Sequence, residues 1–193
     1  MTRWIITLFL TTILLLGQRS IGQNKFSLSG GFGYKTNSSE FVSLMFNYRP
    51  NKRIEFSIGP SIHYIFAGQG ATTSMKIYYP TDKKIFLNTE VAYRHLFSTK
   101  LSISPVDHES EVGNYSIPSN DFLFIGEGIN FIVKNNTTTG KTAKINFTLC
   151  YGIPFKTYIS TFTSGIESAD IEKQINNRIT GGFGFSISYC VDL

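Results

Sequence analysis

Large apolar residues alternate with small or polar residues along most of this chain, and the alternation runs to its last residue. The closing stretch RITGGFGFSISYCVDL has an apolar side chain at every second position from Phe183 to Leu193, with glycine, serine, cysteine and aspartate between them. Such alternation predicts a β-strand with one apolar face, because successive side chains of a strand point to opposite sides. The pattern therefore predicts an all-β fold.

The same alternation predicts eight strands after the first 22 residues. We expect them over 25–34, 40–48, 53–66, 84–97, 100–106, 121–133, 143–155 and 178–193. Two further strands, 74–79 and part of 109–118, would raise the count to ten. No segment has a convincing helical period. In the sixth strand the alternation places Glu127 on the apolar face. Either it is tolerated there, or a bulge at the neighbouring glycines moves it to the polar face.

The predicted links differ in length between the two ends of this set of strands. Links after odd-numbered strands are mostly long (67–83, 107–120 and 156–175), whereas links after even-numbered strands are short. Outer-membrane barrels have short turns on the periplasmic side and longer loops outside. An even strand count also places both chain ends on the same side of a barrel.

The first 22 residues match a secretory signal peptide. A basic residue, Arg3, precedes an apolar run from Ile5 to Leu16, and small residues follow up to Gly22. The run is shorter than the roughly 20 apolar residues that a membrane-spanning helix needs. We therefore expect export, cleavage before Gln23, and one barrel domain over 23–193.

Charge and cysteine content exclude several classes of protein. The chain has 18 Lys and Arg against 13 Asp and Glu, and loss of Arg3 and Arg19 with the signal leaves 16 against 13, a net charge of +3. This excess is too small to predict nucleic-acid binding. Two cysteines do not make a disulfide framework. The expected register also places Cys150 and Cys190 too far apart along their strands to bond.

The polar face of the predicted strands indicates what each side of the sheet meets. It carries mainly glycine, serine, threonine and asparagine, which suits the narrow interior of an eight-stranded barrel better than a surface in water. The apolar face then meets lipid, where a closed barrel leaves no unpaired strand edge. We therefore expect an eight-stranded antiparallel up-and-down transmembrane β-barrel. A soluble barrel or sandwich is the alternative.

The candidates for interfacial aromatic residues are Tyr34, Tyr48, Tyr64, Tyr93, Tyr151 and Tyr189.

Several ionisable residues fall on the interior parity and form a candidate polar network. They are Arg53, Glu55, His63, Glu90, Arg94, Lys144 and Arg178. Buried charges must pair, because an unpaired one costs several kcal/mol. If 53–66 pairs directly with 84–97, Glu55 lies nearly opposite Arg94, so we expect an ion pair there. An interior filled in this way predicts a barrel without an open pore.

The signal peptide, the alternating strands and the closing pattern Phe185-x-Ile187-x-Tyr189-x-Val191-x-Leu193 resemble the small outer-membrane β-barrel proteins, in particular the PorT-like and OmpA-barrel-like proteins of Bacteroidota. The resemblance implies residence in the outer membrane of a Gram-negative bacterium, as a monomer in contact with lipid. It also implies assembly by the barrel-assembly machinery, which reads the final strand. The family typically ends in an aromatic residue, whereas this chain ends in Leu193.

Three functional classes fit these observations. The first is a structural or interaction barrel that presents loops, the second a narrow conduit for small or apolar solutes, and the third a lipid-modifying enzyme. The stretch Asp107–Glu111 (DHESE) contains a histidine, a serine and carboxylates, as nucleophilic catalysis requires. We expect it in a polar loop, where such residues gather routinely. We therefore predict no catalytic residue, no cofactor, no metal and no nucleic-acid partner, and favour the first class.

Overall fold

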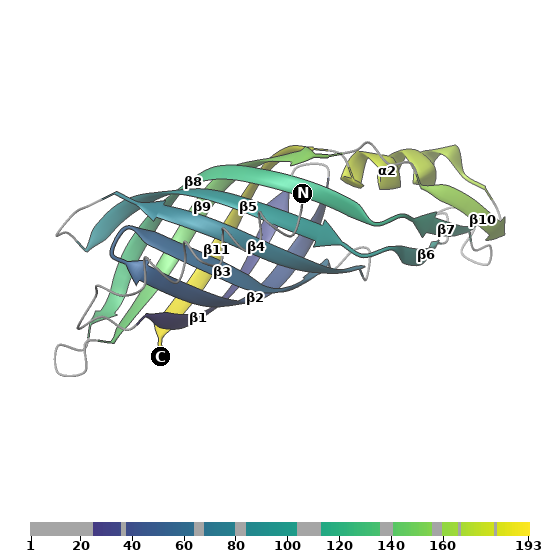
Figure 1. Cartoon of the computed structure of the whole chain (residues 1–193). Coiled ribbons are helices and arrows are strands. Elements are labelled where there is room, and N and C mark those ends of the chain that lie inside the picture. Colours follow the sequence, from purple (N-terminus) through teal and green to yellow (C-terminus); the bar gives the residue numbers. More distant parts are fainter. Residues whose placement is uncertain are drawn as a thin grey trace, which may run out of the picture.

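Eight strands of the computed structural model close into an antiparallel barrel, in the order β1-β11-β9-β8-β5-β4-β3-β2 (Figure 1). The structure describes residues 25–35, 38–63, 68–79, 84–103, 113–135, 141–155, 160–165, 167–179 and 181–193. The barrel strands are β1 (Phe26–Lys35), β2 (Ser38–Asn51), β3 (Ile54–His63), β4 (Gly68–Tyr78), β5 (Ile85–Leu96), β8 (Asn120–Asn135), β9 (Thr142–Pro154) and β11 (Gly182–Asp192). The predicted all-β fold with an eight-stranded barrel is confirmed.

Each barrel strand pairs with its predecessor and its successor in the barrel, and β1 pairs with β11 to close it. The start of β1 and the end of β11 lie side by side, since the Leu193 N–H donates to the Phe26 carbonyl at 3.0 Å. We call this the terminal end of the barrel. The opposite end, where β8 begins at Asn120 and β11 begins at Gly182, is the loop end.

One member of the predicted strand list was wrong. The expected link 67–83 contains β4, which pairs with β3 and β5 on either side. The expected strand 100–106 is instead β6 (Thr99–Ile103) and lies outside the barrel. The possible extra strand 74–79 corresponds to the second half of β4. Its first half was not recognised because its outward positions are Gln69, Ala71 and Thr73, so the alternation there is one of small and polar residues.

A small second unit, which we call the cap, lies beyond the loop end at the right of Figure 1. It consists of a three-stranded sheet, β10 (Thr161–Gly165), β7 (Gly113–Ile117) and β6, together with the helix α2 (Ala169–Ile179). Its core is Tyr115, Ile117, Ile171 and Ile175, with Leu101 and Phe162 packed against it. The cap is formed by the two longest connections. The possible extra strand within 109–118 is β7 of the cap, whereas 74–79 lies in the barrel strand β4, and the barrel has eight strands rather than ten.

The helix α2 corrects the expectation that the chain has no helix. Ile171 and Ile175 are four residues apart and pack on the same face, and the hydroxyl of Ser168 accepts from the Ile171 N–H at 3.5 Å as an N-cap. Arg178 lies in this helix rather than in the closing strand, which begins at Gly182. No helix in the described part of the chain is long and apolar enough to cross a membrane.

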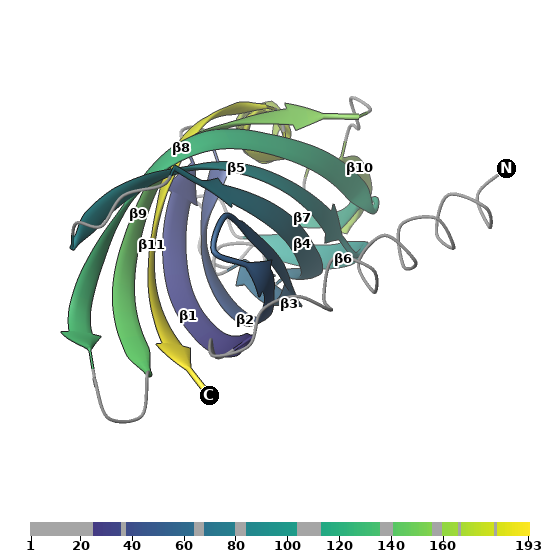
Figure 2. The same cartoon turned by 60° about the vertical axis from the view of Figure 1, so that its left-hand side comes forward.

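Figure 2 shows the barrel strands curving around a common interior. The outer and inner faces of this wall differ in chemistry. Every barrel strand carries large apolar side chains that are exposed on the outer face, among them Val42, Ile58 and Leu149. Interior positions such as Ser61, Asn88 and Asn146 are polar and buried. Glu127 is exposed on the outer face, among the apolar residues of β8, so no bulge at the neighbouring glycines changes which residues point outward. The irregularity in the pairing of β8 with β9 lies between Ile132 and Lys134 instead.

Candidate functional site

A cluster of four side chains, which we call the terminal plug, crosses the interior of the barrel near the terminal end: Arg49, Glu55, Tyr78 and Lys144. Glu55 is 1% exposed, and its Oε2 accepts from Arg49 Nη2 at 2.6 Å and from Lys144 Nζ at 2.9 Å. Lys144 Nζ also donates to the Tyr78 hydroxyl and lies 4.5 Å from the centre of its ring. These residues come from β2, β3, β4 and β9, so the cluster reaches across the interior.

Three buried asparagines extend the plug along β5, β8 and β9. Asn88 Oδ1 accepts from Asn130 Nδ2 at 2.6 Å and from Asn146 Nδ2 at 2.9 Å, and Asn146 Nδ2 also lies 3.1 Å from Asn130 Oδ1. Gly128 makes room for them, because a Cβ there would lie 2.6 Å from Asn88 Oδ1. The three asparagines therefore pack as a layer that leaves no space for a side chain at position 128.

A second charged pair lies one step further into the barrel. Lys76 Nζ is 3.7 Å from Glu90 Oε2, and both side chains are mostly buried. The hydroxyl of Thr148 donates to the same Glu90 oxygen at 3.4 Å. Register explains the pairing, since Lys76 on β4 lies directly opposite both Glu55 on β3 and Glu90 on β5.

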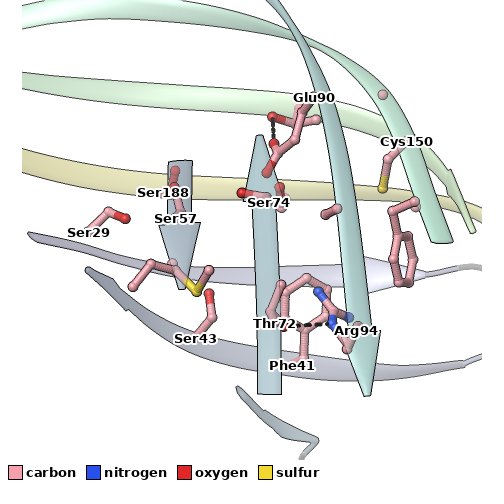
Figure 3. Close-up of a pocket in the computed structure, with 18 of the residues that line it drawn as sticks. Ser29, Phe41, Ser43, Ser57, Thr72, Ser74, Glu90, Arg94, Cys150 and Ser188 are labelled. Carbon is pink, nitrogen blue, oxygen red and sulfur yellow. Dashed lines mark hydrogen bonds between the residues drawn. The ribbon is translucent and has the colours of Figure 1, made fainter. Parts of the chain in front are cut away.

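Arg94 lies on the loop side of the interior and is 8% exposed. Its guanidinium carbon is 3.8 Å from the centre of the Phe41 ring and 4.7 Å from that of Phe124. Its Nε donates to the Thr72 hydroxyl at 3.2 Å, as Figure 3 shows. Aromatic rings therefore contact a cation whose edge still carries further N–H donors.

A cavity of about 80 Å³, which we call the chamber, separates Arg94 from the terminal plug (Figure 3). The order of inward residues along single strands shows this: β4 presents Tyr78, Lys76, Ser74 and Thr72 in turn from the terminal end. Large residues such as Phe41, Met45 and Phe124 border the chamber, but serine and glycine make up much of its wall and leave the space open. The serine and glycine residues that line it are Ser29, Gly31, Ser43, Ser57, Ser74, Gly126, Gly184, Ser186 and Ser188.

The structure places the residues of the expected polar network in three different settings. Glu55, Glu90, Arg94 and Lys144 face the interior. Arg53 is exposed in the turn between β2 and β3, and α2 holds Arg178. His63 is the last residue of β3, and its side chain lies outside the described part of the structure.

The expected Glu55–Arg94 ion pair is wrong. The prediction paired β3 directly with β5, but β4 lies between them and its register brings Glu55 level with Glu90. Arg94 lies level with Thr72 instead, two inward positions nearer the loop end. The partners of Glu55 are Arg49, which falls in the short link between the expected strands 40–48 and 53–66, and Lys144, which only closure of the barrel brings near.

Some interior residues were not recognised as functional candidates from the sequence. Lys76 was missed because the eight-strand prediction placed it in a link and gave 74–79 only as a possible extra strand. The three asparagines were on or near the predicted polar faces, but nothing in the sequence indicated that they would meet. Cys150 and Cys190 also face the interior, where they lie opposite Gly184 and Lys144 and form no disulfide.

Two polar clusters lie on the outer face. Near the loop end, Asp121 Oδ1 is 2.7 Å from His95 Nδ1 and accepts from the Tyr93 hydroxyl at 2.6 Å. Further toward the terminal end, Glu127 Oε1 accepts from the Thr89 hydroxyl at 2.7 Å. The candidate stretch 107–111 lies outside the described residues. Within the described ranges, no three His, Cys, Asp or Glu side chains gather as metal ligands would.

Comparisons with known proteins support the architecture. No family model and no curated protein matches the sequence. The structure is similar to the crystal structure of the N-terminal β-barrel domain of Pseudomonas aeruginosa OprF, with a TM-score of 0.50 and 11% identity over 89% of this chain and 98% of that one. At this level of identity the similarity concerns the fold alone. This chain therefore shares the eight-stranded barrel fold of the OprF domain.

Proposed function

We propose that this chain is a small outer-membrane β-barrel protein that anchors its cap at the cell surface as an interaction module, as a monomer and without an open pore. The observation that carries the proposal is the belt of exposed apolar side chains on all eight barrel strands. Soluble monomers tolerate contiguous apolar patches of only a few hundred Å². A closed barrel with a polar interior and an apolar wall is what a lipid bilayer accepts.

The lengths of the connections support an orientation. The two connections that form the cap are the longest, and both leave the loop end, whereas the start of β1 and the end of β11 lie at the terminal end. In outer-membrane barrels the long loops are extracellular and the short turns periplasmic. The alternating closing strand β11 supports assembly by the barrel-assembly machinery, and on the same pattern we propose kinship with the PorT-like barrels.

Cysteine labelling of intact cells tests location and orientation together. Thr163 in the cap and Lys52 in the turn between β2 and β3 are both exposed, whereas Cys150 and Cys190 face the interior. A membrane-impermeant maleimide should label Thr163→Cys and leave the matched control Lys52→Cys unlabelled until the cells are broken. The full chain should also fractionate with the outer membrane and migrate differently in gels before and after heating. A mature chain that is a folded monomer in detergent-free buffer would refute the proposal.

The filled interior supports the anchor over the conduit. The terminal plug crosses the barrel, and the asparagine layer lies against it. An eight-stranded barrel has an interior just wide enough for side chains to fill. Purified protein in planar bilayers should therefore give no large, stable conductance. Such a conductance in the wild type would favour the conduit.

One observation favours a second candidate, an enzyme that modifies lipid. The His95–Asp121 pair lies on the outer wall near the loop end, where a carboxylate holding one ring nitrogen would orient the other as a base. The described residues offer no serine, threonine or cysteine bonded to this histidine, so we rank the enzyme second. Mass spectrometry of outer-membrane lipids from cells that carry wild type or His95→Ala tests it. A lipid product that depends on His95 would favour the enzyme.

A further inference from the structure

We propose that the chamber in the barrel interior is a binding site for one small inorganic anion, held by the guanidinium of Arg94. The proposal goes beyond the anchor function and does not depend on it. It rests on the chamber itself, on the unbalanced charge of Arg94 and on hydroxyl groups that face the same space.

Arg94 is a buried cation that makes no ion pair with any carboxylate that the structure describes. Of the carboxylates that the structure describes, Glu55 pairs with Arg49 and Lys144, and Glu90 lies near Lys76, while none is within 4 Å of the Arg94 guanidinium. Burial of an uncompensated charge is costly, so interior charges are normally paired. The rings of Phe41 and Phe124 lie against the Arg94 guanidinium, but they carry no charge and cannot neutralise it.

The geometry of Arg94 leaves donors for a ligand. Guanidinium donors lie in the plane of the group, and the described contact along that plane is the one from Nε to Thr72. The side chain borders the chamber, and Figure 3 shows it directed into the space between the strands. An anion in the chamber would accept from the remaining N–H groups and supply the missing negative charge.

The rest of the chamber is built of adaptable donors. Ser57 is 6% exposed, and its Oγ has no hydrogen-bond partner, although it borders the chamber. Other serines line the same space, among them Ser43 and Ser74. A hydroxyl rotates to donate to an anion or to a water that hydrates it. The volume of about 80 Å³ admits one small anion with a few waters, since a water needs roughly 10–15 Å³ by the same kind of measure.

Charge selects an anion over a cation. The interior contributes four basic side chains (Arg49, Lys76, Arg94 and Lys144) and three carboxylates (Glu55, Glu90 and Asp192) from the described residues, which leaves one positive charge in excess. Glu90 also borders the chamber and repels an anion, so it should weaken binding. This opposition of Arg94 and Glu90 gives the test two variants with opposite expected effects.

Bromide is the test ligand, because it is small and scatters anomalously. The full mature chain, refolded in neutral detergent, is melted while bromide replaces gluconate at constant ionic strength. Gluconate is too large for the chamber and keeps charge screening unchanged. The melting temperature of the wild type should rise with the logarithm of bromide concentration once the site begins to fill.

Arg94→Gln should abolish this bromide-dependent rise, even if the variant melts lower than wild type in gluconate. Glu90→Gln should lower the bromide concentration that gives half of the effect. Lys52→Gln, which removes an exposed cation outside the chamber, should behave as wild type. Crystals grown in bromide should show an anomalous peak in the chamber beside Arg94. No rise in the wild type, a full rise in Arg94→Gln, or anomalous peaks on the protein surface alone would each overturn the proposal.

Discussion

Truncation of Glu55 is the sharpest test of how the barrel interior is stabilised. Glu55 is 1% exposed and is shared by Arg49 at 2.6 Å and Lys144 at 2.9 Å. Glu55→Ala would leave both cations without their carboxylate. We expect this single change to destabilise the folded barrel strongly.

The burial of the two cations sets the magnitude. Removal of one partner of a buried ion pair costs about 3–5 kcal/mol, because the other charge stays desolvated. The Arg49 side chain is 19% exposed and can partly recover solvent, whereas the Lys144 side chain is 8% exposed and keeps only the Tyr78 hydroxyl and ring. The cost therefore arises mainly from Lys144, and we expect about 3 kcal/mol, at the lower end of that range.

Equilibrium unfolding in urea, followed by far-ultraviolet circular dichroism of the protein in detergent micelles, measures the change. Ser57→Ala is the matched control, since Ser57 lies two residues along β3, is also buried, and has a hydroxyl without a partner. Removal of that hydroxyl breaks no hydrogen bond, so its cost should stay below about 0.5 kcal/mol.

A double variant separates charge from packing. If Lys144 carries the cost, Glu55→Ala combined with Lys144→Met should be less destabilised than the sum of the single changes by at least about 1 kcal/mol. Additive effects, or a Glu55→Ala variant as stable as Ser57→Ala, would refute the argument that the terminal plug is held by compensation of charge.

Three further changes test the wall of the barrel, each by the free energy of unfolding of the protein folded into lipid bilayers. Phe147→Arg puts a charge on the apolar outer face and should cost about 2–4 kcal/mol, whereas Thr148→Ser on the interior face should cost little; equal effects would contradict the assignment of faces. Gly128→Ala forces a Cβ into the asparagine layer and should cost about 1–3 kcal/mol, while Gly30→Ala, with no atom within 4 Å of the added Cβ, should be nearly neutral; a neutral Gly128→Ala would show that the layer yields. Glu127→Leu removes a carboxylate from the outer face and should stabilise the barrel by roughly 1 kcal/mol, so a loss of stability would indicate that Glu127 serves the fold.

Alternation alone determined the class of fold and the two faces of its wall. The outward residues of β11 and β9, such as Phe185 and Phe147, were identified because period two is a local property of a strand and needs no knowledge of its neighbours. The same reasoning placed Glu55 and Lys144 on the polar face. Where alternation was weak, as in β4 with Gln69, Ala71 and Thr73 facing outward, a strand of the barrel was missed.

A helix signal was present in the sequence but was outweighed by the pattern around it. Ile171 and Ile175 are four residues apart and follow the capping Ser168, which together indicate a short helix. The residues Leu101 and Ile103 alternate as barrel residues do, yet β6 belongs to the cap. Local pattern cannot tell which sheet a strand joins, because that depends on the partner across the pairing, here β7.

Only the tertiary structure decided which interior charges meet. The partner of Glu55 depends on the register of every strand between it and the candidate, and one missed strand moved Arg94 away from it. Lys144 is 89 residues distant in sequence and reaches Glu55 because the sheet closes on itself. Closure brings side chains from opposite walls together, and it also leaves the chamber where serine and glycine are too small to fill it. A single strand determines its own faces, but the contents of a barrel depend on all eight strands at once.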